Sequence, residues 1–216
     1  MSKTKHVKYP RTPHLPWSPG RNDDDVHLNS IQHLEQLEDL VVTEKLDGEN
    51  TTIYHDYLHA RSVDSSSHAS RNWIKRFSAE WRHRIPEDFR VCGENVFARH
   101  SIFYRSLTSY FYVFAIFQND ICLSWDETVI CCESLGVEIV PVLYRGKWEE
   151  PKIKACWRGA SVFGEEQEGY VVRNAASFGF KAFTSNVAKH VRAAHVKTDS
   201  HWMSKAVVPN QLTEHF

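Results

Sequence analysis

Hydrophobic and polar positions along the chain follow two different periods, which separate predicted helices from predicted strands. Apolar side chains recur every three residues in 31–40 and every four residues in 71–85, which predicts two amphipathic helices. Two more helices are predicted for residues 126–136, ending at Gly136, and for residues 149–159. Runs rich in β-branched and aromatic residues predict strands in 41–45, 51–63 (two strands), 88–104, 109–117, 120–125, 137–146, 168–173, 178–183 and 185–192.

The order of these elements predicts the fold class. Helices are inserted among the strands without a strict β-α alternation, which favours an α+β domain built on antiparallel sheets with flanking helices. Four of the eight prolines lie in residues 9–25, and proline excludes a regular helix or a central strand there. We therefore expect one domain over residues 1–216, with an extended lead-in at 1–29 and a short C-terminal tail at 193–216.

Composition narrows the classes of function. The formal net charge of −1, from 26 basic and 27 acidic residues, excludes binding of nucleic acid by bulk positive charge and leaves only a local basic face. No apolar run approaches the roughly 20 residues of a membrane span, and the first residues lack a secretory signal, so a cytoplasmic protein is expected. Five cysteines without C-x-x-C spacing predict reduced thiols in the core.

The segment from Glu44 to Asn50, EKLDGEN, is the most informative for chemistry. Lys45 lies between two predicted strands and directly before an Asp-Gly turn, so the backbone on both sides orients its amine. A lysine becomes a nucleophile only after it loses a proton, which neighbouring cations or a bound metal promote. K-x-D-G by itself is also compatible with a solvated lysine beside a hairpin turn.

Further polar and aromatic residues follow Lys45 in a fixed order and favour a functional role for Lys45 over a solvated side chain. Arg61 lies in ARSVD, Glu94 in CGENVFARH and Phe114 in FYVFAIF, and later come Glu168 in EGYVVR and Lys189 in NVAKHVR. This ordered set, from Lys45 to Arg192, resembles the motifs of the covalent nucleotidyltransferases, which comprise DNA ligases, RNA ligases and mRNA capping enzymes. The resemblance covers about two thirds of the chain and implies a ligase adenylation domain, a nucleotidyltransferase fold similar to ATP-grasp.

The resemblance also implies a role for each matched residue. Lys45 attacks the α-phosphorus of ATP and forms a lysyl-AMP, Glu168 holds Mg²⁺ or Mn²⁺, and Lys189 neutralises the α-phosphate. These three residues form the catalytic set. The nucleotide-binding residues implied are Glu44, Lys45, Asn50, Arg61, Glu94, Phe114, Lys189 and Arg192.

Within the superfamily, the sequence is most similar to RNA ligases of the phage type-2 kind. Asn50 after K-x-D-G, the G-E-N around Glu94 and the E-G-x-V-x-R from Glu168 all resemble that group. Two positions depart from its pattern. Val191 replaces a second lysine after Lys189, so that either Arg192 or Lys197 takes its place or the contact is missing. No Asp follows Phe114, which leaves Phe114 and Phe117 as alternatives for the base-stacking ring.

The sequence thus predicts an ATP-dependent RNA ligase that joins a 3′-hydroxyl to a 5′-phosphate, with an accessory RNA-repair protein as a further candidate partner. The basic residues of the helix at 71–85 are the candidates for RNA phosphate contacts: Arg71, Lys75, Arg76, Arg82 and Arg84. Three alternatives stay open: a minimal DNA ligase, a capping-type nucleotidyltransferase, and a non-catalytic nucleotide-binding module. The 24 residues after Arg192 are too few for the OB-fold domain that DNA ligases and capping enzymes append.

Overall fold

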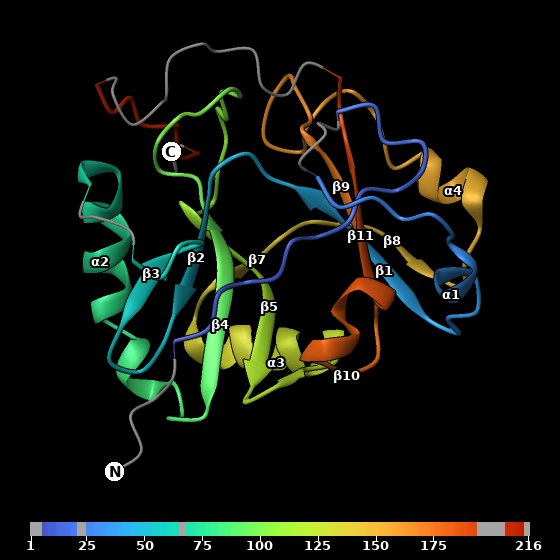
Figure 1. The fold of residues 1–216 in the computed structure, drawn as a ribbon. Helices are drawn as coiled ribbons and strands as arrows, with labels where there is room; N and C mark the ends of the chain where they lie inside the picture. The colour runs from blue at the N-terminus through green and yellow to red at the C-terminus, as the bar shows by residue number, and fades with distance from the viewer. Residues whose placement is uncertain (1–5, 21–24, 65–67, 194–205, 214–216) are drawn as a thin grey trace.

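Two largely antiparallel β-sheets form the frame of the molecule (Figure 1). The computed structural model describes residues 6–20, 25–64, 68–193 and 206–213. The larger sheet has the order β10-β6-β5-β4-β2-β3, with β7 parallel to β5, and the smaller has the order β11-β9-β1-β8. The larger sheet contains β2 (Glu49–Ile53), β3 (Leu58–Ala60), β4 (Phe89–Asn95), β5 (Phe111–Gln118), β6 (Ile121–Cys122), β7 (Glu138–Ile139) and β10 (Phe178–Gly179). The smaller contains β1 (Leu40–Lys45), β8 (Val142–Gly146), β9 (Gly169–Asn174) and β11 (Val187–Val191).

Helices cover the outer sides of the two sheets (Figure 1). Helices α2 (Asn72–Ala79) and α3 (Trp125–Leu135) bury Ile74 and Leu135 against the larger sheet. Helices α1 (Gln32–Glu35) and α4 (Glu150–Lys154) bury Leu34 and Ile153 against the smaller sheet. The predicted α+β class with antiparallel sheets and flanking helices is confirmed. Three short 3₁₀ helices complete the secondary structure: η1 (Ala69–Arg71), η2 (Arg82–Arg84) and η3 (Phe180–Ser185).

The strand register of the smaller sheet places different side chains on its two faces. Lys45 pairs with Gly169, and Lys189 pairs with Val171. Because side chains alternate along a strand, Lys45 and Lys189 point to one face, while Val42 and Val172 point to the core on the other. One face is therefore free for chemistry, and the opposite face is hydrophobic.

Gly169 lets β9 approach β11 closely. A Cβ atom at position 169 would lie 1.9 Å from the carbonyl oxygen of His190, a distance that no side chain can occupy. Gly169 also directly follows Glu168 and pairs with Lys45 in the register of β9 and β1.

The proline-rich lead-in is part of the folded structure. The main chain of Lys189 donates to the carbonyl of Pro13 and accepts from the amide of Leu15, at 2.8 Å in both cases, so this segment extends the smaller sheet beyond β11. At the other end, the Asn210 side chain bonds the carbonyl of Val96 and the amide of Tyr104. The described parts of both predicted terminal segments thus pack onto the domain.

Several element predictions differ from the structure. The strand predicted at 88–104 ends at Asn95, the strand predicted at 120–125 is limited to Ile121–Cys122, and the helix predicted at 149–159 ends at Lys154. Residues 137–146 form two strands in different sheets, because Pro141 lacks the amide that would continue either ladder. Residues 178–183 form β10 followed by η3, and the helix predicted at 71–85 ends at Ala79 before η2. The helix predicted at 31–40 is only one turn long, because Leu40 pairs with Gly146 and Asn174 in the smaller sheet.

All five cysteines are free thiols; four are buried and Cys131 is half-buried. None of the helices in the described ranges has both the length and the apolar character needed to cross a membrane.

We expect Gly169→Ala to lower the free energy of unfolding by about 2 kcal/mol or more, because the added methyl group overlaps the His190 carbonyl. Gly179→Ala is the matched control, since a Cβ there has no neighbour within 4 Å, and its effect should stay within about 0.5 kcal/mol. Urea denaturation of both variants measures the difference. Equal stability of the two would show that β9 and β11 can move apart freely.

Candidate active site

A cleft of about 560 Å³ is lined by residues from both sheets and from the lead-in. This volume is typical of small-molecule sites. From the smaller sheet, β1, β9 and β11 present their polar face to the cleft, and from the larger sheet β2, β4, β5 and β6 contribute. Of the residues predicted to bind nucleotide, seven line this cleft: Glu44, Lys45, Asn50, Arg61, Glu94, Phe114 and Lys189.

Lys45 and Glu168 form an ion pair at the end of β1. The Nζ atom of Lys45 donates to Oε1 of Glu168 at 2.7 Å and to Oε2 at 2.6 Å. The Glu168 side chain is 1% exposed, whereas the Lys45 side chain is 24% exposed and reaches the cleft. The structure thus brings together two of the three predicted catalytic residues, which are 123 positions apart in the sequence.

The surroundings of Lys45 hold its amine in the charged form. Burial lowers the pKa of the amine, but the negative charges of Glu168, Glu94 and Asp47 more than offset burial and raise the pKa above its ordinary value. An amine in this state is not a nucleophile. Positive charge brought close to Glu168 would weaken the hold on the proton and release the free amine.

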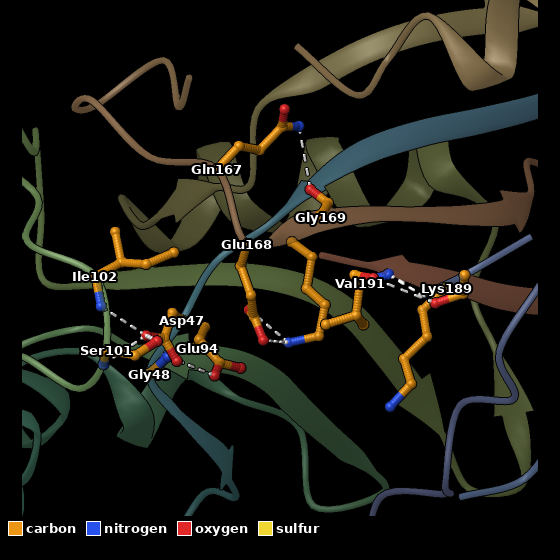
Figure 2. Close-up of polar contacts among 12 residues, drawn as sticks. Asp47, Gly48, Glu94, Ser101, Ile102, Gln167, Glu168, Gly169, Lys189 and Val191 are labelled. Atoms are coloured by element: carbon orange, nitrogen blue, oxygen red, sulfur yellow. Dashed lines mark hydrogen bonds and ion pairs between the residues drawn. The ribbon is translucent and has the colours of Figure 1, made fainter. Parts of the chain in front are cut away.

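The pKa values of Glu94 and Lys189 are shifted the other way, so that the neutral form of each group is favoured. Burial, together with the charges of Glu168 and Asp47, raises the pKa of Glu94 to about 8 despite the opposing charge of Lys45. Burial and the neighbouring charge of Lys45 lower the pKa of Lys189 to about 8. Both groups therefore change charge near neutral pH. In Figure 2, the Glu168 side chain lies between Glu94, from β4, and Lys189, from β11.

Asp47 anchors the loop that carries Lys45 (Figure 2). One oxygen of its carboxylate accepts from the Ser101 amide at 2.8 Å, from the Ser101 hydroxyl at 2.7 Å and from the Ile102 amide at 2.9 Å. The Tyr104 hydroxyl accepts from the Asp47 amide at 2.8 Å. Next to it, Gly48 approaches β4 so closely that a Cβ would lie 2.5 Å from the Asn95 carbonyl oxygen. The K-x-D-G turn is therefore held by the loop after β4.

The remaining cleft residues offer polar atoms and an aromatic ring to a ligand. Oδ1 of Asn50 and Oε1 of Glu44 are buried without a hydrogen-bond partner among the described residues, which is costly unless a ligand binds there. Phe114 lines the cleft, whereas Phe117 is fully buried beneath Arg90. Of the two rings left open by the sequence, Phe114 is the one a ligand can reach.

Arg192 is placed differently from its prediction. Its guanidinium lies 3.2 Å from Glu166, and it is absent from the described lining of the cleft. Its main-chain amide donates to the carbonyl of Glu168 at 2.9 Å, so its backbone supports Glu168. The alternative residue, Lys197, lies outside the described residues.

The sequence did not indicate four further cleft residues: Tyr9, Arg11, Asp25 and Arg173. The first three belong to the lead-in, whose long-range pairing with β11 has no local signal. Arg173 ends the EGYVVR segment; its guanidinium donates to the carbonyls of Phe114 at 3.2 Å and Leu123 at 2.7 Å, and so joins the two sheets. The sequence feature that could have indicated Arg173 is a basic residue at the end of a buried strand.

The predicted basic helix face is smaller than expected. Arg71 is 6% exposed and forms a two-pronged ion pair with Glu49, so it does not belong to an RNA-facing surface. Arg84 donates to the carbonyls of Ser134 and Leu135 at the end of α3. Lys75 and Arg76 are exposed and Arg82 is half-buried.

The acidic groups around Lys45 fit a metal that arrives with a ligand. Among the described residues, no group of three or more His, Cys, Asp or Glu side chains could hold a metal ion alone. Mg²⁺ and similar hard cations often bind one or two carboxylates and take their other ligands from water and phosphate. Glu168 suits that arrangement, because both its oxygens face the cleft lysine.

We expect Glu94→Gln to stabilise the protein progressively as the pH rises from about 4.5 to 8. In this window the unfolded carboxyl ionises while the folded one, with its pKa of about 8, keeps its proton, so wild-type stability falls as pH rises and the glutamine variant escapes that loss. The gain at pH 8 should be a few kcal/mol, of the order expected from such a pKa shift. Denaturation at pH 5, 6.5 and 8, with the exposed Glu87→Gln as control, measures it; a difference independent of pH would mean that Glu94 is ionised throughout.

Comparisons with known proteins place this site in a family. Residues 38–191 match the RNA ligase family. No curated protein matches the chain. Among solved structures, a Naegleria gruberi RNA ligase variant with ATP and Mn is 20% identical, with a TM-score of 0.56 over 77% of this chain and 54% of that one.

Two other structures of the Naegleria gruberi RNA ligase show the same fold. The complex with PPi is 18% identical, with a TM-score of 0.55 over 87% of this chain and 61% of that one. An apo variant is 18% identical, with a TM-score of 0.54 over 74% and 51%. The aligned part thus spans about half to three fifths of those ligases. Because the family match covers more than half of the sequence, the chain belongs to the RNA ligase family.

Proposed function

We propose that the protein is an ATP-dependent RNA ligase that works through a lysyl-AMP on Lys45. The observation that carries this proposal is the Lys45 amine, held 2.6–2.7 Å from both oxygens of the buried Glu168 carboxylate at the wall of a nucleotide-sized cleft. The Naegleria gruberi ligase structures with ATP and Mn support ATP and a divalent cation as the reagents. A closer relation to the phage type-2 ligases stays a prediction.

In the first step, the free amine of Lys45 attacks the α-phosphorus of ATP; an N–P bond forms and the bond to the β-phosphate oxygen breaks, so that pyrophosphate leaves. Lys45 must first lose the proton that its acidic neighbours hold. A divalent cation bound at Glu168 would supply the positive charge that lowers the pKa of the amine. Lys189, across the cleft on β11, stabilises the charge that develops on the α-phosphate.

The rest of the cleft suits the nucleoside. Phe114 offers a ring for stacking on adenine, a contact worth about 1–3 kcal/mol per base. Glu94 accepts hydrogen bonds from the ribose hydroxyls, and Arg61 offers a forked cation to ribose and phosphate oxygens. Asn50, which pairs with Glu94 across β2 and β4, has an unpartnered Oδ1, whereas the side chain of Glu44 alternates with that of Lys45 and points to the opposite face of β1.

The later steps act on RNA. AMP passes from Lys45 to the 5′-phosphate of an RNA end, and the 3′-hydroxyl of a second end attacks that phosphate, releasing AMP. The two ends must be aligned at the cleft for sealing. Lys75, Arg76 and Arg82 near α2 are the candidates for phosphate contacts, with an accessory RNA-repair protein as a further partner and the cytoplasm as the setting.

Incubation with α-labelled ATP and Mg²⁺ or Mn²⁺ should attach label to the denatured wild-type chain, and Lys45→Ala should abolish it because Lys45 is the amine bonded to both oxygens of Glu168 at the cleft. Glu168→Gln should reduce labelling at least a hundredfold, since it removes the charge expected to bind the cation. Exposed Glu87→Gln is the control and should label normally. Full labelling of Lys45→Ala would refute the covalent mechanism, and labelling by GTP in place of ATP would favour a capping enzyme.

Sealing assays on matched nicks should show joining when the 3′-hydroxyl strand is RNA and at least tenfold less when it is DNA, because a 2′-hydroxyl distinguishes the two. In a Lys75→Ala/Arg82→Ala variant, we expect the salt dependence of RNA binding to become shallower, by roughly one in the log–log slope for each lost phosphate contact. Equal joining of all-DNA nicks would favour a DNA ligase. An unchanged slope would place the RNA elsewhere on the surface.

A further inference from the structure

Three cations and one carboxylate gather at the side of the cleft away from Glu94. Arg11 comes from the lead-in, Arg61 follows β3, and Lys189 lies on β11; Asp25, also in the lead-in, lines the cleft with them. Burial lowers the pKa of the Arg61 guanidinium, the charge of Arg11 lowers it further, and the charge of Asp25 raises it. These charges therefore act on one another directly.

The main chain holds Asp25 in place. His14 donates its amide to the Val26 carbonyl at 2.7 Å and accepts from the Leu28 amide at 3.0 Å, so the residues after Asp25 pair with the strand-like segment beside β11. From this position, Oδ1 of Asp25 lies 3.8 Å from the Nζ atom of Lys189, and Oδ2 lies 3.4 Å from Nε2 of His14. The Asp25 carboxylate thus lies beside Lys189, the lysine proposed to bind phosphate.

The other carboxylates of the described cleft lining have different partners. Glu49 pairs with Arg71, Glu94 accepts from the Gly48 amide, and Glu44 accepts from the Val162 amide. Asp25 is the carboxylate that faces the cations. A carboxylate among three cations has the charge and the acceptor oxygens of a phosphate group, but a polyphosphate carries more charge and more oxygens.

We propose that Asp25 is a built-in competitor for polyphosphate. Arg11 and Arg61 bind the β- and γ-phosphates of ATP, these two cations and Lys189 bind the departing pyrophosphate, and Asp25 takes the place of the phosphates when pyrophosphate leaves. This proposal rests on the proposed function and adds Arg11 and Asp25 to the site. The consequence is kinetic as well as thermodynamic. By lowering the affinity for pyrophosphate, Asp25 favours its release over the reverse reaction, in which pyrophosphate attacks the lysyl-AMP and regenerates ATP.

The test is the affinity for inorganic pyrophosphate, measured by calorimetry on full-length protein free of AMP. Asp25→Asn should tighten pyrophosphate binding by roughly three- to tenfold, and Arg11→Gln should weaken it by a similar factor, as expected for one charge at a few ångströms in a partly solvated site. Asp25→Glu keeps the charge and should stay within about twofold of wild type. Asp56→Asn and Lys181→Gln make the same charge changes on exposed residues outside the cleft lining and should have no effect.

AMP provides a second readout, because it lacks the β- and γ-phosphates. Its affinity should change by no more than about twofold in Asp25→Asn, because its phosphate meets only Lys189 of the three cations. If AMP tightens by the same factor as pyrophosphate, the substitution has merely opened the cleft and the proposal is wrong; unchanged or weaker pyrophosphate binding in a folded Asp25→Asn variant also overturns it. Since binding requires no chemistry, normal pyrophosphate effects without labelling of Lys45 would reject the ligase proposal and leave this one standing.

Discussion

The buried carboxylate of Glu168 and the largely enclosed amine of Lys45 form an ion pair where β1 and β9 meet. The antiparallel register that pairs Lys45 with Gly169 brings the Glu168 carboxylate to the amine, and the missing side chain at Gly169 lets β11 come close enough to add Lys189. Breaking one partner of such a pair leaves an uncompensated charge, so the pair also constrains the sheet. It keeps the amine protonated. In the proposed mechanism, a cation that competes for Glu168 would release the free amine, which would couple formation of the nucleophile to arrival of the nucleotide.

Charge balance in the cleft follows from burial together with neighbouring charge. Burial, with the charges of Glu168 and Asp47, raises the pKa of Glu94 to about 8, so that it holds its proton near neutral pH. Burial, with the charge of Lys45, lowers the pKa of Lys189 to about 8, so that it gives up its proton more readily. A polyphosphate that enters between them meets positive charge on one side and hydrogen-bonding carboxyl groups on the other. Under the proposed function, this charge distribution would orient a nucleotide with its phosphates toward β11 before any bond changes.

The alternation of hydrophobic and polar residues correctly predicted the strands that carry Lys45 and follow Glu168, because alternate residues of VVTEK and EGYVVR face the core. It failed where distant contacts decide. The lead-in was predicted to be extended, but no local pattern indicated that Pro13 and Leu15 pair with Lys189, which places Asp25 in the cleft. Arg71 matched an exposed basic face because a helical pattern does not show that Glu49, from β2, would bury it. Both failures involve pairs whose energy depends on tertiary geometry that no single segment encodes.

The K-x-D-G turn shows why a short motif can be so specific. Lys45 points into the cleft, Leu46 points into the core and is 2% exposed, Asp47 accepts three hydrogen bonds from the loop after β4, and Gly48 fits against the Asn95 carbonyl. Four consecutive residues thus meet four different requirements, and only the first concerns the reaction. The other three fix where the amine stands relative to Glu168. The position of the Lys45 amine therefore depends as much on the larger sheet, which holds the turn, as on the smaller sheet, which carries the lysine.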